Sequence, residues 1–283
     1  MHDFELLKKC LLESGVKKGD IIYMASDITL CLTQARKNGI KSQMQIDSYL
    51  NEFINVLQDI VGVEGTLLFP VFTWKFCRER FFDARTSLGE VGSLNNWILK
   101  KRSDFVRTKH PLYSFMVWGK EADYLSSIAN VDAWGEDSIF AHLHHNHGKM
   151  VLFNVSLQRG FTFVHYVEEC IRVPYRYNKS FSGLYVDMEG KESKRTCTMY
   201  VRDLDIISKG ILLDDFFYAA NIMERRMWNG CEIKVVNDFS DAYNLIREDF
   251  LHNRGRNCYS FDNYELDWSK GATHDDDFSN GLP

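Results

Sequence analysis

Residues 162–169, TFVHYVEE, hold the side chains best suited to acid–base chemistry. On a helix, Thr162, His165 and Glu168 lie three residues apart and share one face. Glu169 lies four residues from His165 and can reach it as well. A carboxylate beside an imidazole fixes its tautomer and raises its basicity, which suits a general base that takes a proton from an amine. Taken alone, the pattern also fits a His–Glu pair on an ordinary helix.

The position of this segment in the chain favours a functional site. An apolar run at 149–155, KMVLFNV, is the expected strand before it, and a short loop joins the two. Catalytic groups in α/β folds collect at the carboxyl ends of strands. We therefore expect His165 to stand at the edge of a sheet, near the start of a helix.

Two further segments carry polar side chains beside expected strands. GTLLFPVFTW ends with Thr73, whose hydroxyl can bond a thioester carbonyl or the pantetheine arm, or simply cap a loop. RTKHPLYS offers Arg107 as a phosphate contact and places His110 and Ser114 just before another strand. Taken alone, this second segment is best interpreted as a solvated loop.

Four histidines in residues 142–147, HLHHNH, suggest a metal site and hence a metal-dependent hydrolase. No second cluster of Cys or Asp completes a ligand set, so we favour an exposed helix end and expect no metal. The chain lacks the P-loop, G-x-G-x-x-G and G-x-S-x-G motifs. Nucleotide hydrolysis, dinucleotide redox chemistry and ordinary esterase chemistry are therefore unsupported.

The composition indicates a soluble, cytoplasmic α/β protein. Apolar residues make up 45% of the 283 residues, and the net charge is −5 with basic residues scattered along the chain, so we expect no nucleic-acid partner. The seven cysteines form no C-x-x-C pair, which is typical of free thiols in a reducing cytosol. We see no signal peptide and no apolar run long enough to cross a membrane.

The periodicity predicts a three-layer α/β/α sandwich with a mixed sheet and an added antiparallel hairpin region in the C-terminal half. The predicted elements are strands at 19–25, 66–72 and 231–237, helices at 3–15, 45–61, 214–228 and 238–253, and the hairpin at 183–205. We predict a single domain over 1–253, followed by a polar, loosely ordered tail over 254–283.

In their order along the chain, these motifs resemble the aminoglycoside 3-N-acetyltransferase family. The matching segments are GD at 19–20, GVEGTLLFPVFT at 62–73, FD at 82–83, RTKHPLYS at 107–114, WGEDSIF at 134–140 and TFVHYVE at 162–168. The resemblance covers about residues 16–175 and extends weakly to 250. Each motif is short, but their order and spacing together are specific.

The resemblance implies an acetyl-CoA donor and direct transfer to an amine without a covalent enzyme intermediate. It makes His165 the base and Glu168 its orienting partner, with Thr162 at the oxyanion. The other residues that it assigns are Ser26, Thr73, Arg107, His110 and Ser114 to CoA, and Asp83, Tyr166 and Glu169 to the acceptor.

Departures from the family pattern bear on the acceptor. Met24-Ala25-Ser26-Asp27 stands where the family has His and two serines, and Asn154 replaces a common glycine. The acidic stretch of the drug-modifying members is only partly present, as Asp203, Asp205, Asp214 and Asp215. The long loop at 29–44 carries Arg36, Lys37 and Lys41, which suit a diphosphate.

We therefore expect an N-acetyltransferase that acts on a nucleotide-linked aminodeoxysugar for surface polysaccharide. The alternative is an aminoglycoside acetyltransferase that confers antibiotic resistance. A metal-dependent hydrolase and a catalytically inactive binding module stay open as other classes. The expected partners are CoA and a small amino sugar, and a homodimer also stays open.

Overall fold

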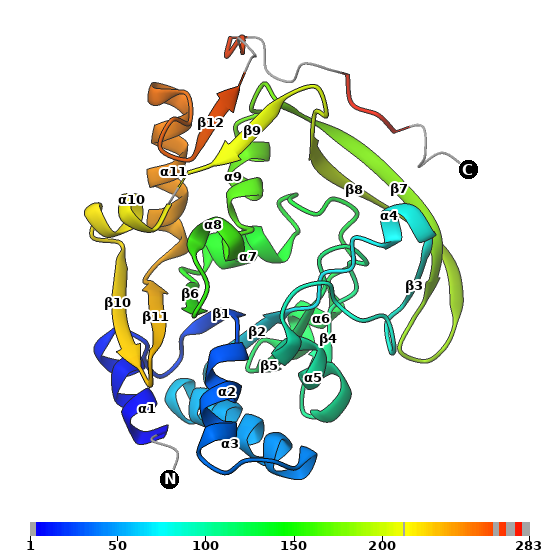
Figure 1. The fold of residues 1–283 in the computed structure, drawn as a ribbon. Helices are drawn as coiled ribbons and strands as arrows, with labels where there is room; N and C mark the ends of the chain where they lie inside the picture. Colours follow the sequence, from blue (N-terminus) through cyan, green and yellow to red (C-terminus); the bar gives the residue numbers. More distant parts are fainter. Residues whose placement is uncertain (1–3, 212, 263–265, 270–274, 279–283) are drawn as a thin grey trace.

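A computed structural model of the chain describes residues 4–211, 213–262, 266–269 and 275–278. Its centre is a mixed seven-stranded sheet (Figure 1). The strands run in the order β10 (Met223–Trp228), β11 (Cys231–Val236), β6 (Lys149–Phe153), β1 (Ile21–Ser26), β2 (Thr66–Pro70), β5 (Phe115–Gly119) and β4 (Val106–Arg107). Strands β6, β1 and β2 are parallel, and the outer strands are antiparallel to their neighbours.

Helices cover both faces of this sheet, which confirms the predicted three-layer sandwich (Figure 1). Strand β1 shows the reason, because Ile22 and Met24 enter one apolar core while Tyr23 and Ala25 enter the other. The first core includes α1 (Phe4–Glu13), α2 (Thr29–Lys37), α3 (Gln43–Val61) and α5 (Ser93–Lys101). The second includes α7 (Ile139–His145), α9 (Val164–Cys170), α10 (Leu213–Ala219) and α11 (Phe239–Asn253).

A smaller three-stranded sheet packs beside the sandwich. It consists of β3 (Phe81–Asp83), β7 (Arg176–Val186) and β8 (Glu192–Arg202). Strands β7 and β8 form the predicted antiparallel hairpin, which begins seven residues earlier than the alternating pattern indicated. The short helices α4 (Phe76–Glu79), α6 (Ala122–Ser127) and α8 (Leu157–Gly160) connect the larger elements.

Two predicted elements are corrected by the structure. The helix expected over 214–228 ends at Ala219, and Met223–Trp228 is strand β10, because it pairs with β11 at the edge of the sheet. The loop expected over 29–44 contains α2, whose Cys31 and Ala35 are buried in the core. Neither Arg36, Lys37 nor Lys41 from this segment lines a pocket near the strand ends.

Part of the predicted loosely ordered tail forms regular structure. Strand β12 (Tyr259–Asp262) pairs with β9 (Ile207–Gly210), and Phe261 and Trp268 pack against the second core. Residues 263–265, 270–274 and 279–283 of that tail lie outside the described residues. The boundary at 253 stays a prediction, although it separates elements that are in contact.

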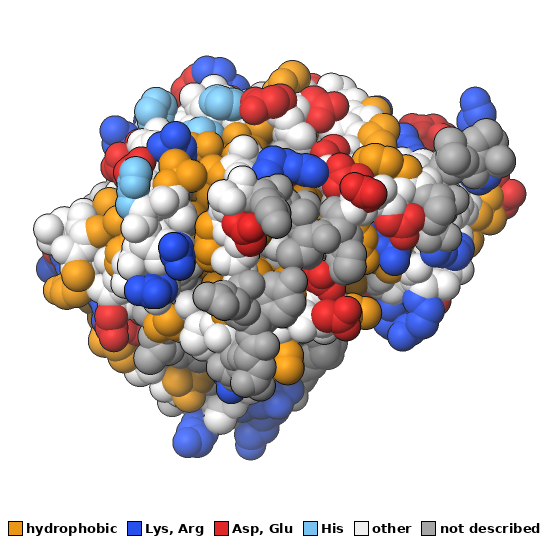
Figure 2. Space-filling view, turned by 90° about the horizontal axis from the view of Figure 1, so that it is seen from above, with side chains coloured by type: hydrophobic (Ala, Val, Ile, Leu, Met, Phe, Trp, Pro, Cys, Tyr) orange, Lys and Arg blue, Asp and Glu red, His pale blue; other side chains and the backbone are white. Residues whose placement is uncertain are grey.

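The topology decides where a site can form. Since β6, β1 and β2 are parallel, their carboxyl ends meet at one edge of the sheet. On the face seen in Figure 2, acidic and basic side chains are interspersed. Among the described residues, no helix is both long and apolar enough to span a bilayer.

Candidate active site

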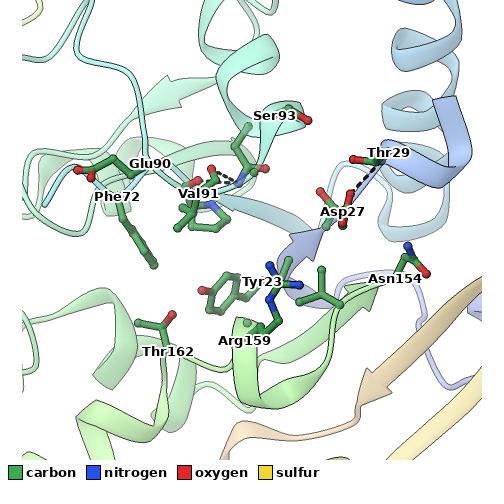
Figure 3. A pocket seen from close by; sticks show the side chains of 17 residues that line it. Tyr23, Asp27, Thr29, Phe72, Glu90, Val91, Ser93, Asn154, Arg159 and Thr162 are labelled. Atoms are coloured by element: carbon green, nitrogen blue, oxygen red, sulfur yellow. Dashed lines mark hydrogen bonds between the residues drawn. The ribbon is translucent and has the colours of Figure 1, made fainter. Parts of the chain in front are cut away.

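Two pockets open at the carboxyl ends of the parallel strands. The first, which we call the strand-end pocket, has a volume of about 370 Å³ (Figure 3). It lies between the end of β1, the turn after β6 and the loop before α5. The lining residues that matter below are Ser26, Asp27, Asn95, Asn154, Arg159 and Thr162.

The second pocket, the His165 pocket, has a volume of about 180 Å³. Its walls come from α8, α9, the end of β9 and the start of β12. Thr162 and Arg159 line both pockets, so the two spaces adjoin at these residues. A long substrate in one pocket and a smaller one in the other would therefore meet beside His165.

His165 lies in the first turn of α9 and is held by a buried carboxylate. Its Nδ1 is 2.6 Å from Glu168 Oε2, and the Glu168 side chain is fully buried whereas that of His165 is 28% exposed. Arg176 Nε lies 2.7 Å from the same carboxylate oxygen. The Tyr175 hydroxyl donates to Glu168 Oε1 at 2.7 Å. The carboxylate is thus fixed from three sides.

These partners keep Glu168 ionised. Burial by itself raises the pKa of a carboxyl group, but the charges of Arg176 and His165 and the hydrogen bonds outweigh it and hold the pKa of Glu168 below its ordinary value. A buried charge is tolerated here because it is both paired and hydrogen-bonded.

His165 is held in its neutral form. Burial and the positive charge of Arg176 lower the pKa of His165 below its ordinary 6.5, against the opposing effect of Glu168. Arg176 Nη2 also lies 3.0 Å from His165 Nδ1. An ionised carboxylate can only accept, so the 2.6 Å contact places the proton on Nδ1, which donates it to Glu168; the Arg176 contact at Nδ1 is then a close approach of two donors and not a hydrogen bond. Nε2 then keeps its lone pair and can accept a proton.

The strand-end pocket contains polar atoms that need a partner. Ser26 Oγ and Asn95 Oδ1 are buried, and neither has a hydrogen-bond partner among the described residues. Such atoms are costly unless a ligand or water bonds them. The amide groups of a pantetheine arm offer both donors and acceptors, so this pocket fits the arm of CoA.

Asn154 explains one departure in the sequence. It adopts a left-handed backbone conformation with φ of 55°, a region in which glycine and asparagine are the residues best tolerated. Asparagine can therefore stand where the family has glycine, and its side chain lines the strand-end pocket.

Four of the residues assigned to CoA from the sequence serve the fold instead. Arg107 is buried and donates to the carbonyl oxygens of Ala84, Ser87 and Val71 and to the hydroxyls of Thr73 and Ser114. Its donors are engaged, so the assignment of Arg107 as a phosphate contact is wrong. Thr73, His110 and Ser114 are also buried, and none lines either pocket.

His110 has a different role from the one expected. Its Nδ1 accepts the backbone N–H of Tyr113 at 3.2 Å, and its Nε2 lies 3.3 Å from the Val131 carbonyl. Burial lowers its pKa to about 4. A neutral imidazole that bridges two backbone segments holds the loop before β5 in place.

The residues assigned to the acceptor also lie elsewhere. Asp83 forms an ion pair with Arg85 at 2.7 Å, and the Tyr166 hydroxyl lies 3.1 Å from His144 Nδ1. Glu169 is partly buried beside Asp132, and burial together with that second carboxylate raises the pKa of Glu169 to about 8. None of these three side chains lines the His165 pocket.

The histidine run gives no support to the hydrolase hypothesis. His142, His145 and His147 each pair with a different carboxylate, those of Glu121, Glu136 and Asp238. No group of three metal-ligating side chains occurs within the described part of the chain. The rings of His144 and His145 stack with centroids 4.7 Å apart, and His144 Nδ1 lies beside the Tyr166 hydroxyl.

Sequence reasoning missed Arg159, Asn95, Tyr175 and Arg176. Arg176 and Tyr175 stand in VPYRY, which carries no recognisable spacing relative to His165. The entry of Arg159 into both pockets depends on the turn between β6 and α9. Only a tertiary arrangement brings these residues to the site, so no sequence signal could have found them.

Comparisons with known proteins agree with this geometry. The family described as aminoglycoside 3-N-acetyltransferase matches residues 39–246. A search of curated proteins finds no match. Several solved structures have the same fold. Their sequence identities to this chain are low, so the likeness supports the fold and not a shared function.

Three of these structures illustrate the likeness. Aminoglycoside acetyltransferase AAC(3)-Xa is 19% identical with a TM-score of 0.69, over 87% of this chain and 92% of that one. AAC-IIIb in a binary complex with CoASH is 18% identical with a TM-score of 0.68, over 89% and 96%. Sisomicin-bound AAC-VIa is 18% identical with a TM-score of 0.68, over 89% and 98%.

The family match spans well over half of the chain and includes strands β2 to β11, the turn after β6 and the helix that carries His165. The mixed seven-stranded sheet agrees with the fold of these relatives. The chain belongs to the aminoglycoside 3-N-acetyltransferase family, whose members are N-acyltransferases that use acetyl-CoA.

Proposed function

We propose that this protein transfers an acetyl group from acetyl-CoA to a primary amine of an amino sugar, with His165 as the general base. The observation that carries the proposal is the position of His165 beside Thr162, where the strand-end pocket meets the His165 pocket. A neutral imidazole with its Nδ1 tied to Glu168 is the base that an amine nucleophile requires.

The strand-end pocket is the proposed site of the CoA arm. Ser26 and Asn95 bring unpartnered polar atoms to it, and Asn154 and Thr29 lie at its rim. Acetyl-CoA would supply the acetyl group as a thioester, whose carbon–sulfur bond breaks as the amine forms a carbon–nitrogen bond. A relative of 18% identity, AAC-IIIb, is known in a complex with CoASH, which supports this assignment.

Side chains of the protein accept and return the proton during the proposed transfer. His165 Nε2 accepts it from the amine as the nitrogen bonds to the acetyl carbon, and the imidazolium then gives it to the departing sulfur. Glu168 stabilises the imidazolium, and Arg176 and Tyr175 hold that carboxylate in place. Thr162, whose side chain lines both pockets, is the proposed donor nearest the acetyl oxygen.

The identity of the acceptor has two candidates. Family membership and the sisomicin-bound relative favour an aminoglycoside, whereas no comparison supports the nucleotide-linked sugar that the sequence suggested. The second candidate is nevertheless favoured by one observation, the lining of the His165 pocket. Among its described lining residues there is no carboxylate, and Arg159 is a cation.

A substitution tests the proposed base. His165→Ala should lower kcat by roughly 10²- to 10⁴-fold, because the amine loses its proton acceptor. CoA release is followed with a thiol reagent, and CoA binding by calorimetry should be unchanged. His147→Ala, at a histidine whose side chain is 70% exposed, is the matched control. Turnover that survived in His165→Ala at the control's rate would refute the mechanism.

A further inference from the structure

A third cavity adjoins the His165 pocket and has no role in the chemistry described so far. This arginine pocket has a volume of about 470 Å³ and shares Ile211 and Tyr259 with the His165 pocket. Its other lining residues are Arg254, Arg256, Ser260, Phe261, Leu266 and Trp268. A ligand that reaches His165 can therefore extend into it without crossing the strand-end pocket.

Two arginines give this cavity its charge. Arg254 and Arg256 follow directly after α11 and are exposed. Within the described residues, neither guanidinium has an ion-pair partner, and no carboxylate lines the cavity. A guanidinium offers forked donors that bind phosphate or carboxylate groups.

The backbone sets the position of these arginines. Arg254 is left-handed with φ of 57°, and Gly255 follows with φ of 69°. This turn ends α11 and leads the chain to β12, whose first residue, Tyr259, is a wall of both pockets. Both arginines thereby line the same cavity as Tyr259.

Aromatic rings form the other side of the cavity. Phe261 lies 4.8 Å from Tyr175 and 6.2 Å from Trp268, measured between ring centroids. Trp268 also stacks on Phe250 at 6.2 Å. The rings are anchored on their inner faces and only partly buried, so they offer a preformed surface on which a planar ring can stack.

The His165 pocket points to the same ligand. It has aromatic walls in Trp74, Tyr113 and Tyr259, a cation in Arg159 and no carboxylate among the described residues that line it. A polycationic acceptor needs several carboxylates to replace its hydration. An acceptor with one amine and a negative charge needs none, and it meets complementary charge in both pockets.

We infer that the arginine pocket binds an anionic, ring-bearing half of the acceptor while its amine lies at His165. The chemical class is an amino sugar that carries phosphate and an aromatic base. This inference rests on the proposed function, since it names the acceptor of the same site. Arg254 and Arg256 are specificity residues here, and neither touches the reacting atoms.

The nucleotide half of CoA has the same chemistry and is the other source of such a ligand. The two sources differ in their path, because the CoA arm is assigned to the strand-end pocket on the other side of Thr162. An acceptor ligand in the arginine pocket should bind together with CoA. A CoA nucleotide there should be displaced by the same probe.

The test is binding of uridine 5′-diphosphate by calorimetry, with and without saturating CoA. The double variant Arg254→Gln/Arg256→Gln should weaken binding of this probe by roughly tenfold or more, since charge-assisted hydrogen bonds are lost. Arg247→Gln, on the exposed side of α11 in a pair with Glu248, is the matched control and should bind as the wild type does. CoA should not compete.

Steady-state kinetics of the double variant are the second part of the test. The double variant should raise KM for a nucleoside-diphosphate-linked amino sugar by a similar factor while kcat and the KM for kanamycin stay unchanged. Probe binding that is equal in the double variant and the wild type, or that CoA abolishes, would overturn the inference. In that case the arginines merely stabilise the end of α11, or they bind CoA.

Failure of the proposed function would look different. One outcome is that no amine acceptor releases CoA while the probe still binds through Arg254 and Arg256. That outcome would support the binding site and refute the proposed transfer reaction. If amines were acetylated normally and the probe did not bind, only the inference about the acceptor would fall.

Discussion

At the scale of single residues, a buried pair of opposite charges lies beside a neutral imidazole. Glu168 and Arg176 are both largely buried, and each is stable there because the other lies 2.7 Å away. The charges of Glu168 and Arg176 nearly cancel. The pair therefore orients the His165 ring without favouring its protonation. The result is a base that stays neutral near pH 7.

The pKa of His165 yields a prediction for pH dependence. Because burial and Arg176 lower this pKa below 6.5, the neutral, active form persists to a lower pH than it would for a free imidazole. We expect kcat at saturating substrates to be flat near pH 7 and to fall only below about pH 6.5.

The measurement is a profile of kcat from pH 5 to 8, since kcat reports groups in the complex and is independent of the titration of the free amine. The control is thermal melting across the same range, which separates loss of activity from loss of fold. An inflection clearly above 6.5 would contradict the environment assigned to His165.

At the level of elements, the loop before α5 shapes the strand-end pocket. Gly89 packs on β2 so closely that an added Cβ would lie 2.8 Å from Val71 Cα. The next residue, Glu90, donates its backbone N–H to the Phe72 carbonyl at 2.7 Å. The wall formed by residues 90–93 thus depends on a glycine at this contact.

Gly89→Ala should move this wall and weaken CoA binding by roughly tenfold, because its Cβ meets backbone that cannot yield. Calorimetric titration with CoA measures the effect. Leu88→Ala changes an adjacent side chain that is 45% exposed and should leave affinity unaltered. Equal affinity in the two variants would show that this loop does not bound the CoA site.

At the level of the whole molecule, the C-terminal segment closes the site. Strand β12 and Trp268 return to the core and surround Tyr175, the residue that bonds Glu168. The Glu168 carboxylate is therefore supported by a part of the chain about ninety residues away in sequence, as the separation of Tyr175 and Trp268 shows.

A chain that ends at residue 253 should be markedly less stable. It loses Tyr259, Phe261 and Trp268, each worth about 1.5–3 kcal/mol of apolar burial, so Tm should fall by more than about 5 °C. Differential scanning calorimetry measures the Tm of the shortened and the full chain. Leu204→Ala, at a side chain that is 86% exposed, is the control and should keep the Tm of the full chain. An unchanged Tm would mean that β12 does not contribute to the fold.

The sequence by itself determined the sandwich and the pairing of His165 with Glu168. Apolar strands that alternate with amphipathic helices leave few other folds, and the three-residue spacing of His165 and Glu168 puts them on one helix face whatever surrounds them. The periodicity predicted a helix at 223–228, MERRMW, where the structure has a strand, because a strand at a sheet edge is defined by its neighbour β11 and carries little signal of its own.

Only the tertiary structure decided which polar residues meet a substrate. Arg107 in a loop motif is equally consistent with a phosphate site and with a cage of backbone carbonyls, and the cage exists only once β2 and the loop after β3 are in place. Arg176 and Arg159 gained their positions in the same way. Spacing fixes neighbours within one element, whereas charge pairs and pockets form between elements that lie far apart in sequence.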